Sequence, residues 1–523
     1  MNEWATSAGQ VAGGGQVAGG GQVAADATAD TPDRATEGIA DTPDRAAGRD
    51  LLLDLAGARS RAALETALRE AVREGRLAPG SRLPSSRVLA RDLALARNTV
   101  ADAYGQLVAE GWLTARQGSG TSVAPRPAPG PPFTAPPQTR RISRRGPTDP
   151  PVPDPAGLPY GLLPGSPDLS SFPRAAWAVA ARRALTTAPS EAFGYTDPRG
   201  RPELRTALAA YLARVRGVRT DPELLVVCTG FVQAVGLLAR VLHGRGGRRI
   251  GVESLGYPDT RTLLRTAGLR TVPLPVDENG AQVAGLTADL AAVLLTPAHQ
   301  FPTGAPLSPG RRTAVTAWAR STGGLIIEDD YDGEFRYDRQ PVGALQGLAP
   351  DHVVYAGTAS KSLAPGLRLA WIAVPPHLLE AVVREKRLAD HHSPVLDQLT
   401  LAEFLTSGAY DRHVRRMRAR YRARRDRLLA AVAEHAPAIR ISGIAAGLHA
   451  VLELPPEAGP LAAVLSSAHR RGLALSGLPT FGAPPSAPPA LVIGYGAPPD
   501  HAFAPTLSLL CEVLSQPAGP DHT

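Results

Sequence analysis

The sequence predicts a multidomain chain in which a small α+β winged helix-turn-helix unit precedes a large α/β domain. Three observations lead to this fold class. Three helical patterns and two short strands follow one another within residues 51–124. From residue 158 to residue 515, strand-like apolar runs alternate with helical patterns, which favours a largely parallel sheet. Between these regions, residues 125–157 are rich in proline and arginine and predict an extended, semi-stiff linker.

The two ends of the chain are expected to lie outside the folded domains. Residues 1–50 are low in complexity: Gly-Gly-Gly-Gln-Val-Ala recurs, and Ala-Asp-Thr-Pro-Asp-Arg-Ala appears twice. Such a segment has too little large apolar surface to offset its ordering entropy, so it predicts a disordered tail. Residues 516–523 are expected to form a second, short tail.

Composition indicates where the protein works. The only two cysteines, Cys228 and Cys511, are too few for a disulfide framework, which is typical of a reducing cytoplasm. The sequence shows no signal-peptide pattern and no uninterrupted apolar run of membrane-spanning length. We therefore expect a soluble cytoplasmic protein without a membrane partner. Its net charge of +8 permits a polyanionic partner.

The first folded unit has the order helix, helix, helix, hairpin. Gly75 ends the first helix, and a serine of Pro84-Ser85-Ser86 is placed to cap the second. Two short strands then flank a Gly-Ser-Gly turn. The apolar stripes of the first and third helices comprise Leu64, Leu68, Ala71 and Val72, and Val100, Ala103, Tyr104, Leu107 and Val108. This order is typical of a winged helix-turn-helix.

Arginines and hydroxyl groups in this unit fall where such a domain contacts double-stranded DNA. The third helix would enter the major groove by its N-terminal residues, the second would offer amides and hydroxyls to a phosphate, and the hairpin would form a basic wing. The expected DNA-binding residues are Arg82, Ser85, Ser86, Arg87, Arg97, Asn98, Thr99, Arg116, Gly118, Ser119 and Thr121. The alternative is that these charged side chains are simply solvated.

Three segments of this unit resemble the GntR family of bacterial transcription regulators. They are Gly75-Arg76-Leu77-Ala78-Pro79-Gly80-Ser81-Arg82-Leu83-Pro84-Ser85-Ser86-Arg87, Arg97-Asn98-Thr99-Val100 and Glu110-Gly111-Trp112-Leu113. The sequence departs from the family at Ala96, where these proteins usually have serine. A hydroxyl that could cap the recognition helix or touch a phosphate is therefore missing.

Lysine is scarce in this chain: only two of its 56 basic residues are lysines. One of them, Lys361, lies in Thr358-Ala-Ser-Lys-Ser-Leu-Ala-Pro-Gly-Leu-Arg368. Arginine stays protonated and forms no imine with an aldehyde, whereas a deprotonated lysine amine can. A surviving surface lysine is the alternative interpretation. Residues elsewhere in the α/β domain favour a chemical role.

Those residues supply what pyridoxal 5′-phosphate (PLP) requires from a protein. Asp329 follows the apolar strand at Leu325–Ile327 and could hold the pyridine nitrogen, while Tyr331 could donate to the phenolic oxygen. Tyr257 is a candidate for stacking on the ring. The expected phosphate-binding residues are Gly230, Phe231 and Val232 at a strand-to-helix turn, and Thr358, Ser360 and Arg368 around Lys361. No metal site is expected.

The large domain also resembles the fold-type I aminotransferases, which are PLP-dependent. The matching blocks are Tyr195–Gly200, Thr296–Gly304 and Ser360–Arg368. With the first unit, the chain resembles the MocR subfamily of GntR regulators, in which an aminotransferase-like domain senses a ligand. The resemblance implies a C-terminal small subdomain, a homodimer that is domain-swapped, Lys361 as the Schiff-base (aldimine) lysine, Asp329 as the pyridine partner, and His299 and Gln300 beside the ring.

Whether the domain turns over substrate is left open. An aminotransferase uses an arginine to grip the substrate carboxylate. No arginine follows Arg471, although Arg199, Arg261 or an arginine of a partner chain could substitute. This favours a transcription regulator that senses PLP or a small amine, without efficient turnover. The alternatives are an active aminotransferase with an appended DNA-binding domain, and a repressor whose large domain only dimerises.

Overall fold

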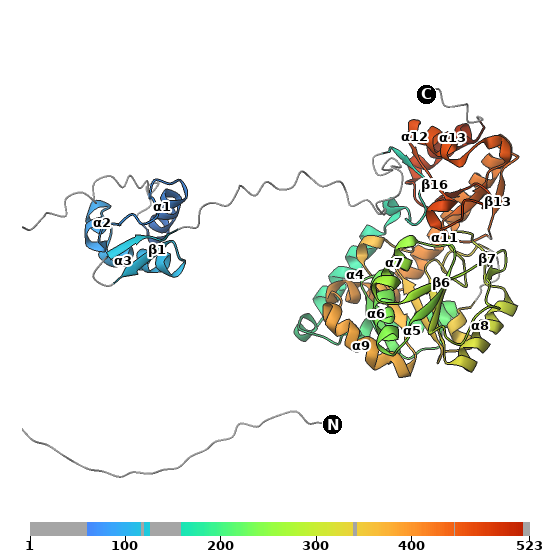
Figure 1. Cartoon of the computed structure of the whole chain (residues 1–523), viewed down its shortest axis with the longest axis horizontal. Coiled ribbons are helices and arrows are strands. Elements are labelled where there is room, and N and C mark those ends of the chain that lie inside the picture. Colours follow the sequence, from blue (N-terminus) through green and yellow to red (C-terminus); the bar gives the residue numbers. More distant parts are fainter. Residues whose placement is uncertain (1–59, 117–119, 126–157, 338–342, 444, 516–523) are drawn as a thin grey trace, which may run out of the picture. The chain divides into compact units, whose positions relative to one another are not determined.

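The computed structural model describes residues 60–116, 120–125, 158–337, 343–443 and 445–515. The chain divides into two compact units, Met1–Asp149 and Pro150–Thr523. Figure 1 shows the elements of each unit. Among the described residues, no helix combines the length and the apolar character needed to cross a membrane. The predicted tails at 1–50 and 516–523 and almost all of the predicted linker lie outside the described residues.

The first unit is a three-helix domain with a hairpin, which confirms the winged helix-turn-helix. Its elements are α1 (Arg61–Arg73), α2 (Ser86–Asp92), α3 (Arg97–Ala109), β1 (Leu113–Arg116) and β2 (Gly120–Val123), and the two strands pair antiparallel. Leu64, Val100 and Leu107 are completely buried in its core. The Tyr104 hydroxyl donates to the Pro84 carbonyl at 3.0 Å, which joins α3 to the segment that begins α2.

The second unit is built on a seven-stranded sheet in the order β4-β12-β11-β10-β9-β5-β6. Six strands are mutually parallel, and β12 runs antiparallel to both of its neighbours. The strands are β4 (Leu225–Cys228), β5 (Arg249–Glu253), β6 (Arg270–Leu274), β9 (Ala292–Leu295), β10 (Leu325–Asp330), β11 (Val353–Thr358) and β12 (Ala370–Ala373). The sheet is therefore largely parallel, as the sequence predicts, and β12 makes it mixed.

Helices cover both faces of this sheet because its central strands are apolar on both sides. Leu325 and Ile327 of β10 pack in one core with α6, α7 and α9, whereas Ile326 packs in another with α8. The helices are α4 (Arg174–Thr187), α5 (Pro202–Arg216), α6 (Phe231–Gly244), α7 (Pro258–Thr266), α8 (Pro309–Thr322), α9 (Pro376–Asp390) and α10 (Val395–Thr406). The α/β architecture is confirmed.

A smaller subdomain completes the unit (Figure 1, orange to red). It follows the long helix α11 (Ala409–His435) and contains a four-stranded antiparallel sheet. Its elements are β13 (Arg440–Ser442), β14 (Ala450–Glu453), α12 (Leu461–Arg470), β15 (Leu473–Ala474), β16 (Ser476–Gly477), β17 (Ala490–Ile493) and α13 (Asp500–Ser515). The short strand β3 (Tyr160–Gly161) pairs with β15, so the start of the unit joins this subdomain.

Candidate functional site

The DNA-binding candidates lie at the start of α2, the start of α3 and along the hairpin. Ser85 caps α2, since its hydroxyl oxygen accepts a hydrogen bond from the Val88 amide at 3.4 Å. Arg97 and Asn98 are exposed in the first turn of α3. Ala96 occupies the N-cap of α3 without a side-chain hydrogen bond, as its missing hydroxyl predicts. Gly118 and Ser119 lie outside the described residues.

The candidate DNA-binding arginines differ from several other arginines of this unit in their ion pairs. Arg61, Arg69 and Arg76 pair with acids of the same domain. Arg73 lies over the Trp112 ring, 5.1 Å from its centroid. No ion pair to another described residue occurs at the candidates Arg82, Arg87, Arg97 and Arg116, all of which are exposed. Among the described residues of this unit, the four arginines expected to face DNA are thus without an ion pair.

In the second unit, Lys361 follows β11 and Asp329 lies near the end of the adjacent strand β10. The Lys361 ammonium donates a hydrogen bond to the Gly165 carbonyl. Burial lowers the pKa of Lys361, although Asp332 and Asp329 act in the opposite direction. An amine that loses its proton more readily than usual is better suited to attack an aldehyde.

Two consecutive carboxylates at the end of β10 have different environments. Asp330 is buried and accepts hydrogen bonds from Arg216 and from the Tyr355 hydroxyl, the latter at 2.7 Å. Asp329 is partly exposed, and no described group donates a hydrogen bond to its carboxylate. Burial and the neighbouring Asp330 raise the pKa of Asp329 well above its usual value. An unpartnered carboxyl beside Lys361 fits the pyridine nitrogen of PLP.

Residues expected at the phosphate come from the start of α6 and from the loop around Lys361, and these two segments meet where Gly230 lies against Arg368. Gly230 has φ +114° and caps the start of α6, and a Cβ at this position would collide with the Arg368 guanidinium. The Thr358 hydroxyl donates to Ser360 Oγ at 2.8 Å. Phe231 and Val232 form the first turn of α6, whose amides have no partners within the helix. These donors and the exposed Arg368 fit a phosphate group.

A partly buried relay of hydrogen bonds holds this turn. The Thr229 amide donates to Gln233 Oε1 at 2.8 Å, and Gln233 Nε2 donates to Asp390 Oδ2 at 2.7 Å. Lys386, the second of the two lysines, donates to Asp390 Oδ1 at 2.5 Å and its side chain is fully buried. The relay has no counterpart in the local sequence motif, because Asp390 and Lys386 come from α9.

The aromatic candidates are brought together, but Gln300 is occupied elsewhere. The Tyr257 ring stacks on the Phe301 ring, with centroids 4.5 Å apart and planes at 4°. The Tyr331 hydroxyl lies 3.2 Å from His299 Nδ1. Gln300 is buried, and its amide binds Glu253 at 3.1 Å and the Thr303 hydroxyl at 2.7 Å. We therefore propose a structural role for Gln300 rather than contact with a cofactor ring.

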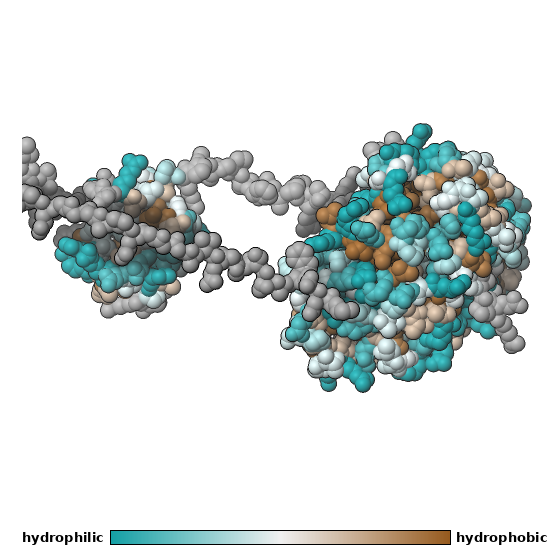
Figure 2. Space-filling view, turned by 90° about the horizontal axis from the view of Figure 1, so that it is seen from below, coloured by the Kyte–Doolittle hydropathy of each residue, from teal (hydrophilic) through white to brown (hydrophobic). Residues whose placement is uncertain are grey.

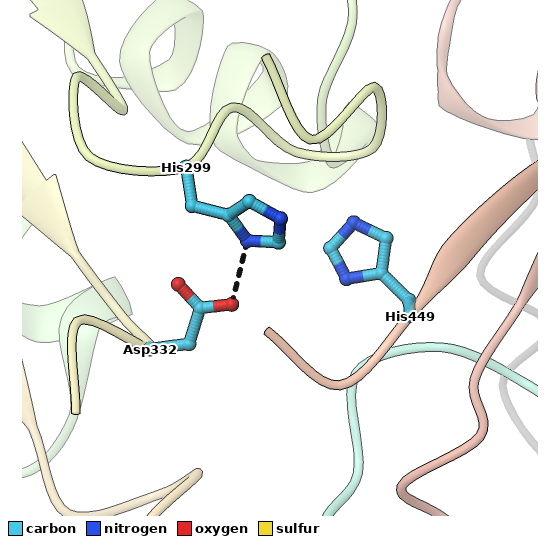
Figure 3. Close-up of side chains that lie close together, drawn as sticks. All are labelled: His299, Asp332 and His449. Atoms are coloured by element: carbon cyan, nitrogen blue, oxygen red, sulfur yellow. Dashed lines mark hydrogen bonds and ion pairs between the residues drawn. The ribbon is translucent and has the colours of Figure 1, made fainter. Parts of the chain in front are cut away.

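Figure 3 shows a cluster that the sequence did not indicate: His299, Asp332 and His449. All three are buried and their ligand atoms lie within 4.8 Å of one another. His299 Nδ1 is 2.8 Å from Asp332 Oδ2, and His449 Nε2 is 3.1 Å from the Pro302 carbonyl oxygen. His449 comes from the small subdomain, just before β14, so only the tertiary fold places it here.

The two arginines considered as substitutes for a carboxylate-binding residue are engaged within the protein. Arg199 pairs with Asp197 and Glu223, the latter at 2.6 Å. Arg261 donates to the backbone carbonyls of Glu253 and Ser254.

Comparisons with known proteins agree with this two-part architecture. Residues 61–123 match the gntR family of bacterial regulatory proteins, and residues 165–476 match the aminotransferase class I and II family. The chain is 33% identical over 448 residues to the HTH-type pyridoxine biosynthesis transcriptional regulator PdxR of Corynebacterium glutamicum, covering 86% of this chain and 94% of that protein. It is 35% identical over 381 residues to the probable rhizopine catabolism regulatory protein MocR of Rhizobium meliloti, covering 70% and 76%.

Solved structures similar to the second unit are aminotransferases. An archaeal alanine:glyoxylate aminotransferase superposes with a TM-score of 0.62 at 27% identity, over 68% of this chain and 90% of that one. The α-aminoadipate aminotransferase LysN of Thermus thermophilus superposes with a TM-score of 0.60 at 26% identity, over 68% and 91%.

Proposed function

Because this chain belongs to the helix-turn-helix transcriptional regulators that join a GntR domain to an aminotransferase class I and II domain, we propose that it regulates transcription in response to PLP or an amine bound at Lys361. The observation that carries the proposal is the pairing of a half-buried amine with an unpartnered carboxyl. Lys361 and Asp329 lie at the ends of adjacent strands. When bound, PLP supplies an electrophilic aldehyde and a protonated pyridine.

The residues of the site then have separable tasks. Asp329 holds the pyridine nitrogen, and Tyr331 binds the phenolic oxygen. Tyr257 covers one face of the ring, and Lys361 holds the aldehyde carbon. The phosphate is bound by the Gly230, Phe231 and Val232 amides and by the side chains of Thr358, Ser360 and Arg368. PLP itself suffices as the effector in this scheme, and an amine that competes with Lys361 for it is the alternative.

Double-stranded DNA is the macromolecular partner. The unpaired arginines Arg97 and Arg87 are placed at the starts of α3 and α2, where they reach base edges and phosphates. Whether Lys361 is joined to PLP biases the placement of two DNA-binding domains and so changes the affinity for paired half-sites.

A homodimer supplies the second DNA-binding domain, and domain swapping through the linker places each head against the partner's large domain. Large hydrophobic side chains remain exposed on and beside α4, α9 and α10: Val179, Leu185, Phe193, Tyr195, Leu388 and Leu396. Hydrophobic surface on the second unit is also visible in Figure 2. Exposed patches of this kind mark association surfaces. We propose that they meet in a two-fold dimer in the cytoplasm.

The test is a spectroscopic titration of the purified protein with PLP. We expect a visible absorption band that disappears on borohydride reduction, with the vitamer then attached to Lys361 in a tryptic peptide. Lys361→Ala should give no band. Asp329→Asn should bind PLP more weakly, because the pyridine nitrogen loses its acid. A wild-type protein that stays colourless at saturating PLP contradicts the proposal.

An active aminotransferase is less well supported. The engagement of Arg199 with Asp197 and Glu223, and of Arg261 with backbone carbonyls, leaves neither to bind a substrate carboxylate. Rapid production of keto acids from amino acids, at the turnover of ordinary enzymes, would support the enzyme instead.

A further inference from the structure

We propose that His299, Asp332 and His449 form the recognition subsite for an amine effector that lacks a carboxylate, such as a diamine or an amino alcohol. This inference rests on the proposed function, since the amine of the effector would react at the vitamer held by Lys361. The three side chains would bind the ammonium or hydroxyl at the other end of the same molecule.

Hydrogen bonds fix which nitrogens of the two imidazoles can receive a ligand. His449 Nε2 faces the Pro302 carbonyl oxygen at 3.1 Å, and a carbonyl can only accept, so Nε2 carries the hydrogen. Burial, together with His299 and Lys361, keeps the pKa of His449 well below its usual value, so the ring is neutral. Its Nδ1 is therefore a hydrogen-bond acceptor, and no described group donates to it.

Hydrogen bonding also fixes the orientation of the His299 ring. Its Nδ1 lies 2.8 Å from Asp332 Oδ2, which makes Nδ1 the donor and leaves Nε2 to face His449 (Figure 3). With a neutral His299, the His299–Asp332 pair carries a net negative charge. With a protonated His299, the pair carries no net charge. In neither state does the pair carry the positive charge that a carboxylate needs.

The subsite is close to the reactive amine. The Phe301 ring lies 5.0 Å from the His449 ring and 4.5 Å from the Tyr257 ring. A Cβ on Gly165 would lie 2.2 Å from the Tyr257 hydroxyl and 4.0 Å from Lys361 Nζ, so both groups meet at Gly165. Asp332 also favours the protonated form of Lys361 by raising its pKa. The two acids that raise the pKa of Lys361 are Asp332 and Asp329, and Asp329 is the one proposed to bind the pyridine nitrogen. Once Asp329 is occupied, Asp332 is the remaining charge for a second ligand group. A cation or a hydroxyl hydrogen satisfies it, whereas a carboxylate is repelled.

Two glycines leave room for this arrangement. A Cβ on Gly447, where φ is +73°, would collide with His299 and come within 2.7 Å of Asp332 Oδ2. A Cβ on Gly304 would lie 3.2 Å from His299 Nε2. Gly447 therefore lets the small subdomain close over the imidazole–carboxylate pair, and Gly447→Ala should displace that pair while Lys361 and Asp329 keep their places.

Matched pairs of compounds test the inference in the wild-type protein. Putrescine and ornithine differ only in an α-carboxylate, as do ethanolamine and serine. Each is titrated into PLP-loaded protein, and the change of the visible band gives the dissociation constant. We expect the two amines to bind about tenfold or more tightly than the two amino acids, the factor given by one hydrogen bond to a charged group.

Variants then test whether the preference for amines over amino acids depends on Asp332 and Gly447. Asp332→Asn should abolish the discrimination between putrescine and ornithine, and Gly447→Ala should reduce it, while both still form the visible band. His435→Gln, an exposed histidine on α11, is the control and should keep the full discrimination. Equal or tighter binding of the amino acids by a protein that forms the band overturns the inference alone. Absence of the band with PLP overturns it together with the proposed function.

Discussion

Arg216 clamps Asp330 through two hydrogen bonds, from Nε to Oδ2 at 2.6 Å and from an outer nitrogen to Oδ1 at 2.9 Å. Both side chains are almost completely buried. Asp330 is the neighbour of Asp329, and successive side chains of a strand point to opposite faces. One carboxylate therefore anchors the strand end to α5, and the other is left for a ligand.

This clamp should be costly to break. Arg216→Met leaves a buried carboxylate without its cation, and we expect it to lower the free energy of unfolding by about 3–5 kcal/mol. Urea denaturation followed by circular dichroism measures the change. Arg214→Met, at an exposed arginine paired with Asp411, should cost less than about 1 kcal/mol. An equal decrease in the free energy of unfolding in the two variants would contradict a larger contribution from the buried pair.

The Thr229–Gln233–Asp390 relay should control affinity for the phosphate of PLP. Gln233→Met removes the acceptor of the Thr229 amide and the donor to Asp390. We expect PLP to bind about tenfold more weakly, while pyridoxal, which lacks the phosphate, binds as it does to the wild type. The control Gln282→Met removes an exposed glutamine that binds Asp277 and should leave both affinities unchanged. Equal weakening for PLP and pyridoxal would contradict the relay.

Glu334 should make stability depend on pH. Burial, with a contribution from Asp330, raises the pKa of Glu334 to about 7, from an ordinary value of 4.5. Between these values the unfolded chain loses a proton that the native state keeps, so rising pH favours unfolding. Glu334→Gln cannot ionise, and we expect it to gain up to about 3 kcal/mol over the wild type across this range.

The measurement is urea unfolding of both proteins at several pH values. Below the ordinary pKa of a glutamate the two should be of similar stability, because Glu334 is then protonated in both states. A stability difference that does not change with pH would contradict the raised pKa.

The free arginines of the first unit should govern DNA binding. Arg97→Ala should weaken binding and make the logarithmic dependence on salt shallower by about 0.9 if one phosphate contact is lost. Arg61→Ala removes an arginine of the same domain that pairs with Glu65, and it should change neither quantity. Fluorescence anisotropy at several salt concentrations gives both. If the two variants behave alike, the recognition helix has been misplaced.

Local patterns sufficed for much of this architecture. Ser85 as a cap, Tyr104 on a buried stripe, and Asp329 and Lys361 after apolar strands all follow from neighbours in the sequence. The edge strand β6 has no clear strand pattern in the sequence, because Arg270, Thr271 and Pro273 interrupt its apolar character. The antiparallel direction of β12 could not be inferred either, since strand direction depends on the path of the connecting chain.

Parts of the site that depend on distant segments were not predictable. His449 meets His299 and Asp332 only because the small subdomain folds against the large one, and Lys386 reaches the phosphate turn from α9. The resemblance implies Gln300 beside the ring, and the fold gives its amide the partners Glu253 and Thr303, which come from other positions in the chain.

We propose above all that binding of PLP at Lys361 changes the affinity of the protein for DNA. The most direct measurement compares the affinity for an operator, selected from random sequence with the wild-type protein, in the absence and presence of PLP. We expect PLP to change the wild-type affinity by about fivefold or more, and to leave the affinity of Lys361→Arg unchanged because a guanidinium keeps the charge without binding the aldehyde. An equal response of the two proteins, or none in the wild type, would contradict the account.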